Sequence, residues 1–180
     1  LQSEFDINKN TLEYIDKQLA EVSVILEQHE DELQAYKENK DILNLTKEEG
    51  LYFSELVKYD QQRRSLELEI QSLTSLDEYV RSSTDEKLLP PAVFITNDEF
   101  LKQTLGQLYS MQMERNGDLF TGKETNPAIQ RLDSTIQLNR LNLLTYIKNA
   151  RAAISSKIGD IQGQSDDYER LIRNMPKKLV

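Results

Sequence analysis

Apolar residues recur along this chain at alternating steps of three and four positions, and this spacing constrains the fold more than any other feature. On an α-helix such residues form one stripe, which becomes buried when a partner helix covers it. We expect the first helix to span about residues 10–44, with Asn10 or Thr11 as its cap. Its stripe consists of Leu12, Ile15, Leu19, Val22, Leu26, His29, Leu33, Tyr36 and Leu43.

A second stripe with the same spacing predicts a helix over about residues 46–82. Thr46 and Glu49 match the pattern of a capping box at its start. Gly50 would ease a bend, so we expect the first two helices to continue into each other through a kink. Arg63 is the one charged residue within the stripe, which consists of Tyr52, Leu56, Tyr59, Arg63, Leu66, Ile70, Leu73 and Val80.

The second half of the chain predicts two more helices. Residues 83–96 contain a proline pair and lack periodicity, which indicates a loop. A helix over about 97–116 follows, capped by Thr96 with Glu99 and ended by Asn116 and Gly117, and a turn at 117–125 comes next. Asn126 as cap and Pro127 at the first position open the longest helix, about 126–174. Its stripe is Ile129, Leu132, Ile136, Leu143, Ile147, Ala150, Ile154, Ile161, Tyr168 and Ile172.

Turn-forming residues are scarce, with only 6 Gly and 4 Pro in 180 residues, so the chain has few and long elements. The sequence predicts an all-α fold: an elongated antiparallel coiled coil of three to four long helices. We expect residues 1–180 to form a single rod. No apolar run reaches the ~18 residues of a membrane-spanning helix. Because the sequence begins at Leu1, we interpret it as an excerpt of a longer membrane protein.

Charge and motif content argue against several classes of function. The net charge of -9 opposes binding to nucleic acid or to anionic membranes. The sequence has no cysteine, no phosphate-binding loop, no dinucleotide fingerprint and no nucleophile elbow. His29 lies on the first stripe, where a polar residue that sets helix register is a simpler interpretation than a pH switch. We therefore predict no catalytic, cofactor-binding or metal-binding residues, and no enzyme activity in this segment.

Two groups of residues are candidates for contacts. Loops at the ends of a rod are free to meet partners, and the residues expected there are Pro90, Pro91, Asn116, Gly117 and Gly122. A line of small residues at helical spacing would either admit a neighbouring helix or subunit closely or make the helix locally flexible. This line consists of Ala152, Ser156, Gly159 and Gly163.

Four segments, in order, resemble one known family. They are NTLEYIDKQL at 10–19, KENKDILNL at 37–45, LLPP at 88–91 followed by a short helix at 97–105, and NPAIQRL at 126–132. Together they resemble the periplasmic region of bacterial polysaccharide co-polymerases, the chain-length determinants of capsule and exopolysaccharide export. In many members this region is fused to a cytoplasmic tyrosine kinase.

The resemblance implies a helical region without catalytic residues, because those of the family lie in the kinase. The whole protein would sit in the inner membrane, form homo-oligomers, project this region into the periplasm and contact an outer-membrane polysaccharide export protein. Polysaccharide is a further candidate partner. The family's membrane helices, membrane-proximal α/β portion and kinase do not occur in this sequence. Two alternatives stay open: a periplasmic adaptor hairpin of an efflux or secretion system, and a cytoplasmic coiled-coil scaffold.

Overall fold

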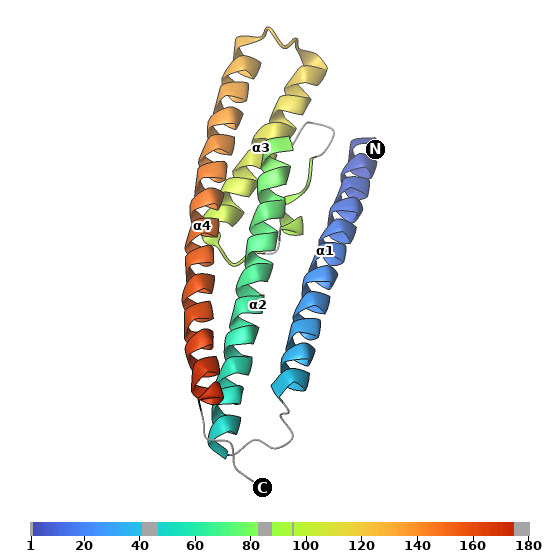
Figure 1. The fold of residues 1–180 in the computed structure, drawn as a ribbon. Coiled ribbons are helices and arrows are strands. Elements are labelled where there is room, and N and C mark those ends of the chain that lie inside the picture. Colours follow the sequence, from blue (N-terminus) through green and yellow to red (C-terminus); the bar gives the residue numbers. More distant parts are fainter. Residues whose placement is uncertain (1, 41–46, 83–87, 95, 175–180) are drawn as a thin grey trace. The chain divides into compact units, whose positions relative to one another are not determined.

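The computed structural model describes residues 2–40, 47–82, 88–94 and 96–174 of the chain. These residues form four α-helices and no strand, so the all-α prediction is confirmed. The elements are α1 (Gln2–Lys40), α2 (Lys47–Ser82), a short 3₁₀ helix η3 (Pro91–Val93), α3 (Glu99–Thr121) and α4 (Pro127–Arg173), as Figure 1 shows.

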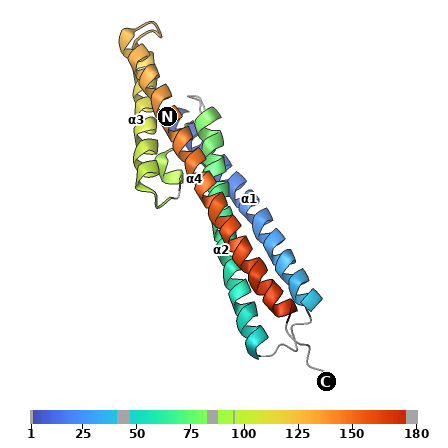
Figure 2. The ribbon, with the colours of Figure 1, turned by 60° about the vertical axis from the view of Figure 1, so that its left-hand side comes forward.

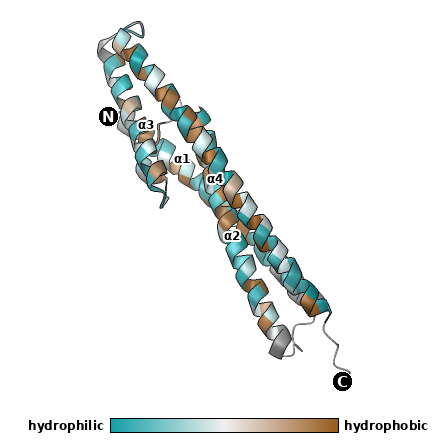
Figure 3. Cartoon of the chain, turned by 90° about the vertical axis from the view of Figure 1, so that its left-hand side faces the viewer, coloured by the Kyte–Doolittle hydropathy of each residue, from teal (hydrophilic) through white to brown (hydrophobic). Residues whose placement is uncertain are grey.

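The chain divides into two compact units. Unit 1 comprises residues 1–19 and 73–150, and unit 2 comprises residues 20–72 and 151–180. Helices α1, α2 and α4 each contribute to both units, whereas α3 belongs to unit 1 alone. In Figure 3, hydrophilic residues cover much of every helix and hydrophobic residues alternate with them, as expected for helices that bury only one side.

Unit 1 has a continuous apolar core. Helices α3 and α4 run antiparallel on either side of the turn at 122–126 (Figure 2), and the last turns of α2 pack against them. Fully burying one such aliphatic side chain stabilises the fold by about 1.5–3 kcal/mol. The buried core residues are Leu76, Tyr79, Val80, Leu89, Leu101, Leu105, Leu108, Ile136, Leu143 and Ile147.

Residues 88–94, between α2 and α3, are anchored to this core. Leu89 is buried, and its backbone N–H donates a hydrogen bond of 3.0 Å to the hydroxyl oxygen of Tyr79. The ring of Phe94 lies 5.1 Å from that of Tyr79 and 5.5 Å from that of Tyr14 on α1. Pro90 and Pro91 are consequently half-buried, and the expectation of a freely exposed tip at these prolines is wrong.

Local caps determine where α3 and α4 begin. Asn126 Oδ1 accepts a hydrogen bond of 2.9 Å from the N–H of Ala128, and Pro127 is the first helical residue, as predicted. Asp98 caps α3 by accepting from the N–H of Leu101 at 3.2 Å. The predicted cap Thr96 lies two residues earlier and accepts from the N–H of Asp98 instead.

Two predicted helix ends need correction. Helix α1 already begins at Gln2, and the Thr11 hydroxyl donates to the carbonyl of Ile7 at 2.8 Å, a bond made inside a helix rather than at a cap. Helix α3 continues through Asn116 and Gly117 to Thr121, so the turn is shorter than the predicted 117–125. The predicted end of the first helix and the Thr46 cap lie outside the described residues.

In unit 2, α2 runs antiparallel to α1. Glu21 of α1 bonds to Gln71 of α2, and Glu32 of α1 contacts Arg63, so residue numbers rise along one helix as they fall along the other. The predicted kinked continuation of the first two helices is therefore wrong: the chain reverses between them. This reversal lets the stripes of α1 and α2 cover each other, which a bend would not.

Helix α4 also packs antiparallel to α2 in unit 2. The ring of Tyr168 lies 5.7 Å from both Tyr52 and Tyr59, and Gln162 contacts Arg63 further along α2. Unit 2 thus contains three helical segments with α2 in contact with both of the others.

The first stripe is only partly buried. Leu12, Ile15 and Leu19 are 63%, 40% and 64% exposed, although their spacing predicts burial. Tyr14 on the adjacent side of α1 packs against the unit 1 core instead. The periodicity correctly indicates a helix, but its apolar stripe does not face the core within unit 1.

Candidate functional site

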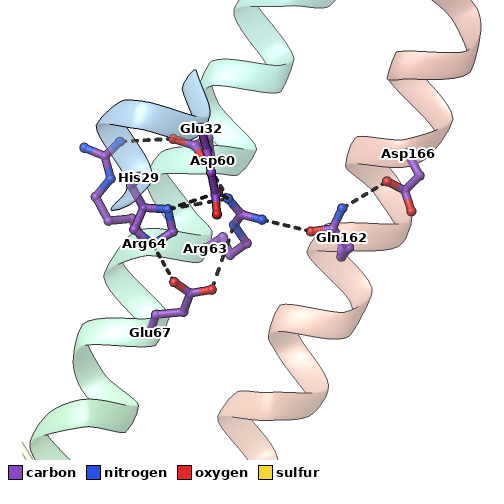
Figure 4. Close-up of polar contacts among 8 residues, drawn as sticks. All are labelled: His29, Glu32, Asp60, Arg63, Arg64, Glu67, Gln162 and Asp166. Carbon is purple, nitrogen blue, oxygen red and sulfur yellow. Dashed lines mark hydrogen bonds and ion pairs between the residues drawn. The ribbon is translucent and has the colours of Figure 1, made fainter. Parts of the chain in front are cut away.

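The main polar cluster of unit 2 surrounds Arg63 of α2 (Figure 4). Its Nη2 lies 3.0 Å from Glu32 Oε2 of α1 and 3.0 Å from Asp60 Oδ1 one turn away on α2. Its Nη1 donates to Gln162 Oε1 of α4 at 3.2 Å. One guanidinium therefore links three helical segments, which explains why a charged residue occupies the apolar stripe.

His29 of α1 joins the same cluster. Its side chain is buried, and its Nε2 lies 2.5 Å from Glu67 Oε2 of α2. Its Nδ1 lies 3.5 Å from Nη2 of Arg63. A neutral imidazole satisfies both contacts when Nε2–H donates to the carboxylate and Nδ1 accepts from the guanidinium. Both ring nitrogens are then occupied by protein groups, so His29 offers no free nitrogen to a substrate or a metal ion.

The charges of the cluster nearly cancel. The carboxylates of Glu32, Asp60 and Glu67 oppose the guanidinium groups of Arg63 and Arg64, and the Arg64 Nη2 donates to Asp60 at 3.1 Å. Gln162 extends the network along α4 by donating to Asp166 at 2.9 Å. In this partly buried cluster each charge has a partner, and that arrangement restricts the helices to one register.

A half-open groove lies beside the network. Its volume is about 140 Å³, below the ~300–1,000 Å³ of typical small-molecule sites. Burial, and next the neighbouring Tyr168, raise the pKa of the Tyr59 hydroxyl on its wall. The lining residues are Glu32, Phe53, Leu56, Val57, Tyr59, Asp60, Arg63, Ile161, Gln162, Ser165 and Glu169.

The residues predicted to make contacts do not converge on one site. Asn116 and Gly117 lie within α3, and Gly122 follows its end. The small residues of α4 are all exposed, and a Cβ atom added to Gly159 or Gly163 would have nothing within 4 Å. No helix of the described part of the chain uses this line as a close-packing surface.

The described part of the chain has no arrangement for metal binding and no helix suited to membrane insertion. Among the described residues, no group of three or more His, Asp or Glu side chains is arranged to hold a metal ion. The helices in the described ranges include none with enough length and apolar character to cross a membrane.

Sequence reasoning identified His29 and Arg63 but missed their partners. Glu67, Asp60 and Gln162 look like ordinary solvent-facing residues in a sequence rich in acids and amides. The sequence did offer one signal for these partners: His29 and Arg63 each lie on an apolar stripe, and a polar residue that is buried there needs a polar partner. Comparison of the chain with protein-family models, curated proteins and solved structures gives no match.

Proposed function

We propose that this chain is a non-catalytic helical region of a polysaccharide co-polymerase. In this role it regulates the length and export of capsular polysaccharide or exopolysaccharide through contacts between copies and with an outer-membrane export protein. The observation that carries the proposal is that NPAIQRL at 126–132 opens the longest helix, at the place where the family resemblance expects its last long helix to begin.

The length and pairing of the helices support the same proposal. Helix α4 has 47 residues, or about 70 Å at ~1.5 Å per residue. In unit 2 it packs antiparallel to α2, and α2 packs antiparallel to α1. Such helices provide reach and surface for protein partners. One departure reduces the family resemblance: the segment at 10–19 lies inside α1 and does not begin a helix.

The polar cluster favours a structural role over a catalytic one. His29 has both ring nitrogens in contact with protein groups, and Arg63 is held by two carboxylates. The adjoining groove is small. A catalytic site needs a nucleophile or base that can reach a substrate, together with a pocket that holds it.

The proposal places the segment in the periplasm, as part of an inner-membrane protein that forms homo-oligomers. The partners are further copies of the chain and the outer-membrane export protein, with the polysaccharide as a further candidate. No cofactor has a role in this segment.

A polymer-length experiment in the native bacterium tests the function. Ile147 is completely buried, so Ile147→Asp in the full-length protein should disrupt unit 1, change the length distribution of the surface polysaccharide and lower the exported amount. Arg170→Ala, at an exposed pair with Asp167, serves as the control and should leave both quantities unchanged. An unchanged polymer after loss of the helical fold would overturn the proposal. A reporter fused within this segment should in addition be active only in the periplasm.

A further inference from the structure

Unit 1 exposes an apolar row on α1. Leu12, Ile15 and Leu19 are 63%, 40% and 64% exposed, and steps of three and four residues place them on one side of the helix. We call these three residues the α1 face. Three large aliphatic residues in one exposed row are more than the isolated ones expected on a soluble surface.

A second apolar row lies on α4 in the same unit. Leu138 and Leu141 are 60% and 61% exposed, on the side of α4 opposite to the buried Leu143 and Ile147. Arg131 precedes Leu138 by seven residues, and Lys148 follows Leu141 by seven, so a base continues the row at each end. We call Arg131, Leu138, Leu141 and Lys148 the α4 face.

The two helical segments carry opposite charge. Residues 2–19 of α1 contain four carboxylates and two lysines, a net charge of -2, and Asp16 lies beside the α1 face. Residues 127–150 of α4 contain Arg131, Arg140 and Lys148 against one carboxylate, a net charge of +2. That carboxylate, Asp133, is already paired with Arg115 of α3. Contact of either face with itself would bring like charges together, whereas contact between the two faces would pair opposite charges.

We infer that the α1 face of one copy of this chain binds the α4 face of a second copy. The inference rests on the self-association included in the proposed function and names the surfaces that produce it. Because the two faces differ, the contact is heterologous: the first copy keeps its α4 face and the second copy keeps its α1 face for other neighbours. Such contacts produce a closed ring or an open chain of copies rather than a two-fold dimer.

Cysteine cross-linking tests the pairing directly, because the sequence contains no cysteine. Ile15→Cys and Leu138→Cys lie near the centres of the two faces, so they should approach each other whichever way the helices run. Under mild oxidation, a mixture of the two variants should give mainly the mixed disulfide dimer. Met113→Cys, at a 38% exposed position of α3, is the control and should cross-link weakly to both. If each variant forms a disulfide dimer with itself as readily as with the other variant, the inference is wrong.

Sedimentation of the 180-residue chain over a range of concentrations provides the second measurement. The parent chain should associate, and Leu138→Glu or Leu19→Glu should abolish association while helicity stays constant, because both positions are exposed. Lys148→Glu should weaken association by up to about fivefold, because it brings a carboxylate toward the acidic segment of α1. A parent chain that stays monomeric would overturn the inference. The polymer-length experiment measures the polysaccharide and not self-association. The proposed function can therefore be correct when this interface is wrong, and this interface can be correct when the proposed function is wrong.

Discussion

His29 and Glu67 are 38 residues apart in the chain, yet the imidazole Nε2 lies 2.5 Å from a carboxylate oxygen. The contact joins α1 to α2, and the imidazole side chain is only 5% exposed. A slip of one helical turn between the two helices would leave the imidazole without its carboxylate and bury it among apolar side chains. The pair therefore selects one antiparallel register for these helices.

The first prediction concerns the energetic coupling of this pair. His29→Ala should lower the free energy of unfolding by about 1–3 kcal/mol, because it leaves a cavity and removes the partner of Glu67. Glu67→Ala should cost less, since this carboxylate is partly exposed. The loss of stability in the double variant should be smaller than the sum of the two single losses, and the difference should be at least about 0.5 kcal/mol. Urea denaturation of the four proteins measures each term.

The second prediction concerns Gln112 of α3, which is only 1% exposed. Neither its Nε2 nor its Oε1 has a hydrogen-bond partner among the described residues. Burying an amide without partners costs free energy, so Gln112→Leu should raise the free energy of unfolding by about 1–3 kcal/mol. Thermal unfolding followed by circular dichroism measures the gain.

Gln107→Leu is the matched control for this variant. Gln107 lies on the exposed side of the same helix, so its substitution should change stability by less than about 0.5 kcal/mol. A lower stability of Gln112→Leu would contradict the prediction and would mean that the amide is paired in solution.

The third prediction concerns Gly159 and Gly163, whose line of small residues faces open space. Replacing either glycine by alanine should stabilise α4 by about 0.8–1 kcal/mol, because alanine has the higher helix propensity and its methyl group meets no atom. Gly122→Ala is the control. A Cβ atom at that position would lie 3.2 Å from the carbonyl oxygen of Asp118, so no comparable gain is expected.

A larger substitution at one of these glycines tests whether the line contacts another copy. If a neighbouring helix packs closely against Gly163, then Gly163→Leu will weaken self-association while the thermal stability of the isolated chain is unaffected. We expect self-association to be unchanged, because the faces that we propose for this contact lie in unit 1.

The sequence predicts helices well where their signals are local. Asn126 and Pro127 define the start of α4 within one residue, because a side-chain cap and a fixed proline φ act over a single turn. Gly117 misled the prediction for α3. An exposed glycine inside a helix costs only about 1 kcal/mol, which the helix on either side of it can offset. Thr11 misled the prediction for α1, because a threonine hydroxyl can bond to a carbonyl within the helix as well as cap its start.

The candidate site was less accessible to prediction because it depends on contacts between distant residues. Spacing places His29 and Arg63 on apolar stripes, but it does not specify that Glu67 and Glu32 lie opposite them. That pairing follows from the reversal of the chain between α1 and α2, for which the sequence instead favours a kink at Gly50. The exposed α1 face has the same origin: periodicity reveals a stripe, and only the packing of Tyr14 reveals which side of α1 meets the core.

The last prediction concerns alkaline pH and Tyr79. Burial raises the pKa of its hydroxyl above the ordinary value of 10.0. A pKa that is higher in the folded state than in the unfolded state gives stability that is complete below pH 10.0 and is lost as the pH rises through the folded-state pKa. The chain should therefore unfold more readily in urea as the pH rises above this value.

Tyr79→Phe should be less stable at neutral pH by about 1–3 kcal/mol, because the N–H of Leu89 loses its acceptor. Its stability should also fall less steeply above pH 10.0, since the buried hydroxyl that would ionise is absent. Parallel slopes for the two proteins would show that Tyr79 does not govern alkaline unfolding and that other tyrosines do, of which Tyr146, whose pKa is raised mainly by its hydrogen bond to Asp98, is the first to test.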